Sequence, residues 1–189
     1  MNFETTSIPD VLILKPRRFG DERGYLMETY KGRSFLEATG HEPDFVQDNF
    51  SLSRQKRTLR GLHFQVPPHA QGKLVRCQRG AILDVAVDVR VGSPTYKDWI
   101  AVELTGENDK QLWVPPGFLH GFLTLVPDTE VAYKCTSYFA PDAEGSVIWN
   151  DANLGVDWGV SARDIILSDK DRMAQSFADF ENPFRFGTE

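Results

Sequence analysis

The chain has 189 residues, of which 41% are hydrophobic, 12% aromatic and 25% charged. This is the composition of a soluble globular protein, and the length suits one domain with a substantial core. The net charge of −6 disfavours nonspecific binding to nucleic acid. No apolar run approaches the about 18 residues that span a membrane, and the N-terminal segment lacks the basic start of a secretory signal. Since there are only two cysteines, Cys77 and Cys135, we expect no disulfide framework and a cytoplasmic protein.

Short β-type segments separated by turn residues dominate the chain. In the clearest segment, residues 81–90, aliphatic side chains alternate with Asp84, Ala86 and Asp88. This alternation predicts a strand with one apolar face and one face that lines a polar cavity. The expected strands are Val11–Leu14, Tyr25–Tyr30, Phe45–Leu52, Leu59–Gln65, Lys73–Gln78, Ala81–Arg90, Trp99–Leu104, Gln111–Val114 and Val131–Phe139.

Two segments, Arg33–Ala38 before Gly40 and Asp169–Phe180, are predicted to be short helices. No linker or repeat divides the chain, so we expect one domain over residues 1–189, with the segment from about residue 160 wrapping the barrel. The stretch WVPPGFLHGF resembles the second half of a cupin motif. The predicted fold is therefore all-β, a cupin-type jelly roll with a few short peripheral helices.

The histidines do not form the usual ligand set of a metal-binding cupin, which offers a His-x-His pair, a nearby Glu and one later His. Here Phe64 and Gln65 follow His63, and no carboxylate accompanies the next histidine, His69. His63 and His120 alone would make a poor zinc or iron site. We therefore expect no metal.

Ionisable residues in strand-like segments are the candidate chemical groups. In TLRGLHFQ, strict alternation puts His63 on the same face as Leu59, Gly61 and Gln65. A lone histidine in a strand is more often a core residue than a catalyst. Ionisable side chains that point into a β cavity are costly unless they are paired or used, so several of them together favour a site for proton transfer. The others are Lys73, Asp84, His120 and Tyr133.

Nearly the whole chain resembles the dTDP-4-dehydrorhamnose 3,5-epimerase family. The matching stretches follow the family's order at compatible spacings: FGDERGYLMETY, FVQDNFSLS, LRGLHFQVPP, AQGKLVRCQRG, DVAVDVR, GSPTY, QLWVPPGFLHGF, AYKCTSYFAP, SVIWND and LSDKD. The resemblance implies a homodimeric jelly roll that works without metal or redox cofactor. It also implies a deoxythymidine diphosphate (dTDP) 4-keto-6-deoxyhexose as substrate and epimerisation at C3 and C5, which yields dTDP-4-dehydro-L-rhamnose.

The resemblance also assigns the catalytic roles. Both carbons adjoin the C4 ketone, so removal of either proton gives an enolate, and reprotonation from the opposite face inverts the centre. His63 matches the family's base, and its ordinary pKa of about 6.5 suits proton exchange near neutrality. Asp171 matches the carboxylate that orients it, although Asp169 lies close enough to be the alternative partner. Tyr133 matches the opposing acid, and Lys73 the cation beside the C4 oxygen.

Further residues match groups that bind the substrate. Arg23 and Arg60 match contacts to the diphosphate, which a guanidinium can hold with two hydrogen bonds. Glu28, Gln47 and Asn49 match residues near the nucleoside. Asp84 and His120 match residues that line the same pocket. Glu144 and Lys170 match groups near the sugar diphosphate, and Tyr138 matches an aromatic that stacks on the base or sugar.

Some of these assignments have structural alternatives. Asp84 and His120 could instead form a buried hydrogen bond that only supports the fold. Tyr138 could be a packing aromatic at the barrel rim. It also has the opposite strand parity to Tyr133, so the two side chains should point different ways unless a bulge intervenes.

Two other functions remain open at this stage. The first is an epimerase of an antibiotic-sugar pathway that acts at one carbon only, because small changes in a pocket decide which carbon meets the base. The second is a noncatalytic cupin that binds a sugar nucleotide. The expected partners are the sugar nucleotide and a second copy of the chain, with no nucleic acid and no membrane.

Overall fold

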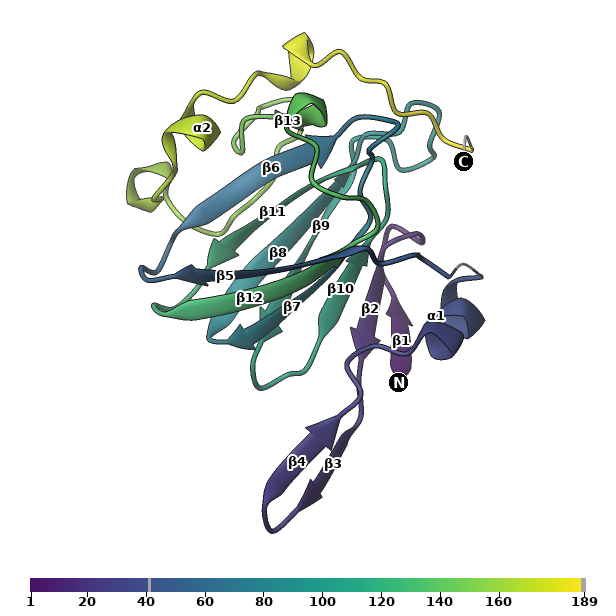
Figure 1. Ribbon diagram of the computed structural model, residues 1–189. Coiled ribbons are helices and arrows are strands. Elements are labelled where there is room, and N and C mark those ends of the chain that lie inside the picture. Colours follow the sequence, from purple (N-terminus) through teal and green to yellow (C-terminus); the bar gives the residue numbers. More distant parts are fainter. Residues whose placement is uncertain (41, 188–189) are drawn as a thin grey trace.

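A computed structural model describes residues 1–40 and 42–187, which form two facing antiparallel sheets and a separate hairpin (Figure 1). The six-stranded sheet has the order β1-β2-β10-β7-β12-β5, and the five-stranded sheet the order β13-β6-β11-β8-β9. This two-layer arrangement with short peripheral helices is the cupin-type jelly roll that the sequence predicts. The strands of the two sheets are β1 (Asn2–Thr5), β2 (Leu12–Lys15), β5 (Gln47–Ser53), β6 (Leu59–Gln65), β7 (Lys73–Arg79), β8 (Ala81–Asp88), β9 (Trp99–Thr105), β10 (Gln111–Val114), β11 (Phe118–Thr124), β12 (Thr129–Cys135) and β13 (Glu144–Ser146).

Every strand predicted from the sequence overlaps an observed strand, but two predicted elements are wrong. The strand expected to run to Phe139 ends at Cys135, because the backbone of the next residues bonds to side chains instead of a neighbouring strand. The helix expected over Asp169–Phe180 is broken. Only α2 (Asp169–Arg172) and the 3-10 turn η3 (Phe177–Asp179) are helical, since Gln175 between them accepts a hydrogen bond from the backbone of Ile148.

Apolar side chains from both sheets meet in the space between them. Val75 of β7, Ala86 of β8 and Val131 of β12 are buried there, with Leu104 and Leu112 on the flanking strands. The same inward faces also carry polar side chains at one end of the layer. The core between the sheets therefore holds the strands at a fixed separation beside these polar side chains.

The C-terminal segment covers the outer face of the five-stranded sheet and lies over β6 in Figure 1. Phe177, Phe180 and Phe184 are each less than a tenth exposed and pack in one cluster with Leu62 and Phe64 of β6. The aliphatic face predicted for residues 81–90 packs in the same cluster. Burial of three phenylalanines is worth several kcal/mol, so this segment is a stable part of the domain.

Helix α1 (Gly32–Thr39) confirms the helix predicted before Gly40, which ends it in the left-handed conformation at a φ of 75°. Its one buried residue, Phe35, packs edge-on against Trp113 at a centroid distance of 5.2 Å. The helix thus covers one end of the outer face of the six-stranded sheet. The rest of that face, which includes Phe50 and Leu52 of β5, is exposed.

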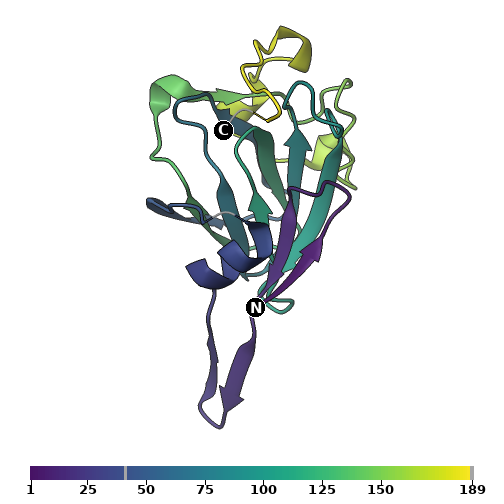
Figure 2. The same cartoon turned by 90° about the vertical axis from the view of Figure 1, so that its right-hand side faces the viewer.

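The hairpin of β3 (Arg18–Asp21) and β4 (Gly24–Met27) projects away from the two sheets, as both views show (Figures 1 and 2). Its base is fixed by Arg18, which forms an ion pair with Asp109 at 2.6 Å. Its apolar side chains are exposed, Tyr25 by 58% and Leu26 by 70%. Within one chain, nothing among the described residues buries them.

Asp151 ties the C-terminal segment to the sheets and gives the first prediction. Its carboxylate is buried and accepts hydrogen bonds from the backbone N–H groups of Phe177 at 2.7 Å and Asn153 at 2.8 Å. We expect Asp151→Ala to lower the free energy of unfolding by about 1–3 kcal/mol, because it leaves a buried N–H group without a partner. Urea unfolding measures this. Asp157→Ala is the control, since Asp157 makes a similar local bond to Gly159 on the surface; equal losses for both variants would contradict the prediction.

Candidate active site

A β-bulge in β6 brings two predicted site residues to one face. His63 lies opposite His120 of β11 and Arg60 lies opposite Phe122, so two residues of β6 face the single residue Gly121. The bulge places Arg60 and His63 on the inward face, although they are an odd number of positions apart. The predicted alternation was wrong here: Leu59 packs with the outer cluster, on the opposite face to His63.

The bulge requires glycine on both strands. Gly61 has a φ of 139°, and a Cβ atom on it would lie 2.6 Å from the Cα of Gly121. A Cβ on Gly121 would in turn lie 2.8 Å from the carbonyl oxygen of Arg60. Any larger residue would force the two backbones apart, so these glycines fix the position at which β6 turns its side chains inward.

His63 is hydrogen-bonded to Asp171 of α2, with 2.6 Å between Nε2 and Oδ1. The alternative partner Asp169 is instead exposed and lies beside Arg172. Burial by itself raises the pKa of Asp171, but hydrogen bonds from His63, Ser168 and the backbone of Gly61 outweigh it and hold that pKa below its usual range. Asp171 is thus an ionised acceptor, which places a proton on Nε2 of neutral His63 and leaves Nδ1 as the basic nitrogen.

Asp84 and His120 form a second carboxylate–histidine pair on the inward face of the five-stranded sheet. Oδ1 of Asp84 lies 2.8 Å from Nε2 of His120, and both residues are buried. The other oxygen, Oδ2, is buried without a hydrogen-bond partner in the structure. Asp84 shares its face of β8 with Ala86, which packs between the sheets, so the pair faces the six-stranded sheet that carries Lys73. The charge of Asp84 raises the pKa of Lys73, although desolvation, the larger effect, lowers it.

The six-stranded sheet supplies Lys73 and Tyr133. Lys73 lies directly opposite Cys135 in the pairing of β7 and β12, and Tyr133 lies two residues before Cys135 on the same inward face. Desolvation lowers the pKa of Lys73, and burial raises the pKa of Tyr133. The tyrosine is therefore protonated at neutral pH and can donate a proton, while Lys73 presents a poorly hydrated amino group.

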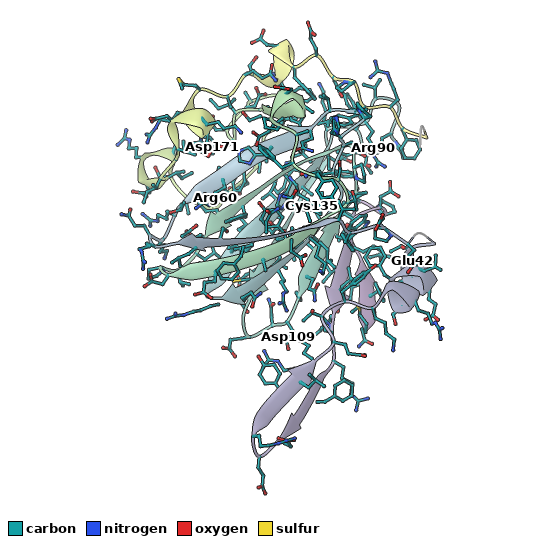
Figure 3. The ribbon with its side chains drawn as sticks, in the orientation of Figure 1. Glu42, Arg60, Arg90, Asp109, Cys135 and Asp171 are labelled. Atoms are coloured by element: carbon teal, nitrogen blue, oxygen red, sulfur yellow. The ribbon has the colours of Figure 1, made fainter. Side chains whose placement is uncertain are left out.

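Other charged and amide residues predicted to bind substrate lie near these groups. Glu144 of β13 acts on both Lys73 and Tyr133 and forms an ion pair with Lys170 of α2. On β5, Gln47 donates a hydrogen bond to Asn49 at 3.0 Å, and Asn49 donates one to the Cys135 sulfur at 3.5 Å. Figure 3 shows Arg60 on β6, Asp171 at α2 and Cys135 between the sheets.

Three predicted residues lie outside this group. Arg23 is in the turn of the projecting hairpin, where it pairs with Asp21 and its side chain is 90% exposed. Glu28 follows β4 and lies 3.9 Å from Lys31. Tyr138 follows the end of β12 and is 67% exposed. Because β12 ends at Cys135, strand alternation does not determine the direction of the Tyr138 side chain relative to Tyr133.

The sequence reasoning missed Ser168, which holds Asp171 in place. Its hydroxyl donates to Oδ2 of Asp171 at 2.7 Å and accepts from the Asp171 backbone N–H at 3.1 Å. The stretch LSDKD contains the signal, since a serine three residues before an acidic residue is a helix N-cap pattern. The N-cap would have favoured Asp171 over Asp169 as the fixed carboxylate.

The described part of the chain contains no group of three or more His, Cys, Asp or Glu side chains arranged to hold a metal ion. No described helix has the length and hydropathy needed to cross a membrane. What the described residues do place on the facing sides of the two sheets is His63 on one sheet, and Tyr133 and Lys73 on the other. This set can move protons on and off carbons that adjoin a carbonyl group.

Comparison with known proteins agrees with this chemistry. Residues 5–179 match the family profile described as dTDP-4-dehydrorhamnose 3,5-epimerase. The enzyme of that name from Salmonella typhimurium is 54% identical over 82% of this chain and 85% of its own length. The one from Shigella flexneri is 48% identical over 95% of this chain and 97% of its own length.

The fold is also shared with solved structures. The dTDP-6-deoxy-D-glucose-3,5-epimerase of Legionella pneumophila, in complex with dTDP-4-keto-L-rhamnose, superposes with a TM-score of 0.92. It is 43% identical, and the match covers 99% of both chains. The family profile, the sequence identity and the fold agree over almost the full chain, and the chain therefore belongs to the dTDP-4-dehydrorhamnose 3,5-epimerase family.

Proposed function

We propose that this chain epimerises C3 and C5 of a dTDP-4-keto-6-deoxyhexose to give dTDP-4-dehydro-L-rhamnose, with His63 as the base and Tyr133 as the acid. The observation that carries the proposal is the placement of these two groups on opposite sheets, with Lys73 on the same face as Tyr133. Inversion at carbon needs removal of a proton on one face of the sugar and its return on the other, and two facing walls provide this.

Each inversion then has two proton transfers. Nδ1 of His63 takes the proton from the carbon, and the electron pair of the C–H bond moves into the enolate while the imidazolium is stabilised by Asp171. Lys73 stabilises the negative charge on the C4 oxygen, and its low hydration strengthens that interaction. Tyr133 then protonates the carbon from the other face. Exchange with solvent restores both groups, so each inverted carbon acquires a solvent proton.

We propose further that the chain works as a homodimer in the cytoplasm. Arg23 and Glu28 lie on the projecting hairpin, away from the cavity of their own chain, and the hairpin exposes Tyr25 and Leu26. A groove of about 320 Å³ on the outer face of the six-stranded sheet, lined partly by Phe50 and Arg76, offers a second surface for a partner. The hairpin of one protomer would then complete the nucleotide end of its partner's site. Two buried free thiols, Cys77 and Cys135, suit a reducing compartment.

The assignment of base and acid predicts a pattern of deuterium exchange. In deuterated water, the wild-type protein should incorporate deuterium at both C3 and C5 of the 4-keto sugar nucleotide, which NMR measures. His63→Ala should slow both exchanges about 10²- to 10⁴-fold, the usual contribution of a general base. Tyr133→Phe should slow inversion more than proton removal, because only reprotonation uses the phenol.

The same NMR assay separates the alternatives. Exchange at one carbon alone would replace the proposal with a single-carbon epimerase, and binding without exchange would replace it with a noncatalytic cupin. Full turnover by His63→Ala would remove the base from the mechanism. A chelator should leave the wild-type rate unchanged, and loss of activity that one metal restores would contradict the metal-free chemistry.

The lowered pKa of Asp171 predicts how stability depends on pH. Since this pKa lies below the ordinary value of 3.8, the ionised carboxylate stabilises the folded state above about pH 4, and the contribution is lost as the pH falls through the folded-state pKa. We expect Asp171→Asn to lower the free energy of unfolding by about 1–3 kcal/mol at pH 7, and the difference from wild type to shrink below about pH 4. Urea unfolding across this range measures it. Exposed Asp169→Asn is the control and should change little; a deficit that grows in acid would contradict the prediction.

The dimer proposal predicts complementation between two defective variants. Arg23→Ala and His63→Ala should each be impaired alone. In a mixed dimer, one site combines the intact hairpin of one protomer with the intact barrel of the other. Random mixing should therefore restore about a quarter of the wild-type rate, since half the dimers are mixed and each has one complete site. No recovery in verified mixed dimers would show that Arg23 does not serve the partner's site.

A further inference from the structure

The segment Ser137–Ala140, which carries Tyr138, is held by glutamine side chains and not by a neighbouring strand. Gln71 donates a hydrogen bond to the carbonyl oxygen of Ser137 at 2.7 Å. Gln47 accepts one from the backbone N–H of Phe139 at 2.8 Å. Each of these bonds joins the segment to a different part of the barrel wall.

Gln65 makes the most extensive of these contacts, because its amide bonds to the backbone on both sides of Phe139, directly after Tyr138. Its Nε2 donates to the carbonyl oxygen of Tyr138 at 3.1 Å, and its Oε1 accepts from the backbone N–H of Ala140 at 2.9 Å. A second Nε2 bond goes to the carbonyl oxygen of His69 at 2.7 Å. Both donors and the oxygen are thus used, which fixes the orientation of the amide.

The position of Gln65 makes these bonds rigid. The residue is 4% exposed and lies on β6, two residues after His63 and on the same inward face. A primary amide offers one acceptor and two donors in a plane, so it can pair with a backbone as another peptide group would. Gln65 therefore replaces the missing strand partner of the segment and joins it to the strand that carries the base.

Packing against the rest of the protein does little to hold the Tyr138 side chain, since this residue is 67% exposed. What places the ring is the backbone beneath it, which Gln65 fixes on the C-terminal side of the tyrosine and Gln71 on the N-terminal side. An exposed aromatic ring on a fixed backbone is a pre-ordered surface for stacking, and binding to it costs little conformational entropy.

We propose that Gln65 is a positioning residue that sets the affinity for the nucleotide by holding Tyr138 in place for stacking. The proposal rests on the proposed function and extends it to Tyr138, which the resemblance matches to an aromatic that stacks on the substrate. Gln65 itself touches no reacting atom in this scheme. Its loss should therefore weaken binding of the nucleotide and leave the proton transfers nearly intact.

The test uses Gln65→Glu, which keeps the shape and the acceptor for Ala140 but sets a carboxylate against the carbonyl oxygens of Tyr138 and His69. We expect the Kd for dTDP, measured by calorimetry on the full-length protein, and the KM for the sugar nucleotide to rise about tenfold, with kcat changed less than about threefold. The control is Gln55→Glu, the same charge change at an exposed residue between β5 and β6.

A double-mutant cycle with Tyr138→Ala distinguishes positioning from a general loss of structure. If Gln65 acts through Tyr138, then Gln65→Glu should raise the Kd for dTDP little further in the Tyr138→Ala background. Additive effects, an unchanged Kd for Gln65→Glu, or a Tyr138→Ala variant that binds dTDP normally would each overturn the proposal. If Gln65→Glu does not fold, Gln71→Ala, which frees the carbonyl group of Ser137, enters the same cycle with the same expected result. Failure of the proposed function is seen separately, as absence of deuterium exchange by the wild-type protein.

Discussion

The close approach of Gly61 and Gly121 is the constraint on which the rest of the site depends. It allows one extra residue in β6, and from this point the strand turns Leu62 and Phe64 outward and His63 and Gln65 inward. Without the bulge, Arg60 and His63 could not share a face, and the arginine expected at the diphosphate would be separated from the base. A bulge costs local pairing, but here the packing on both faces of β6 compensates for it.

The outward face of β6 matters to the chemistry as much as the inward one. Leu62 and Phe64 pack against the C-terminal segment. This segment places Asp171 beside His63, although the two residues are 108 positions apart in the chain. The carboxylate is thus part of the same element that completes the hydrophobic core, and Ser168 fixes its rotamer. Packing energy from the phenylalanines holds His63 and Asp171 within hydrogen-bond distance, which an isolated four-residue helix could not do.

Much of this could be predicted from the sequence, because alternation reports which face of a strand is buried. The carboxylate-bearing face of β8 and the strand positions of Lys73 and Tyr133 follow from it, whereas the helix before Gly40 follows from the glycine that ends it. The failures have physical causes. Alternation cannot show a bulge, so Leu59 was placed on the face of His63. It also cannot show that glutamine amides replace a strand, so β12 was extended through Tyr138. The helix over Asp169–Phe180 failed because tertiary pairing at Gln175 overrides a local helical pattern.

The site divides into two parts that differ in rigidity. His63, Lys73, Tyr133 and His120 stand on strands paired on both sides, where a shift of one residue would move the whole sheet. Arg23, Glu28 and Tyr138 stand on a projecting hairpin or an irregular segment that is fixed by a few side-chain bonds. Proton transfer tolerates errors of only a fraction of an ångström, whereas stacking and ion pairing with a nucleotide diphosphate tolerate more. The regular strands therefore carry the residues proposed for proton transfer, which must be placed accurately. The peripheral segments carry the residues proposed to bind the nucleotide, which must extend away from the sheets.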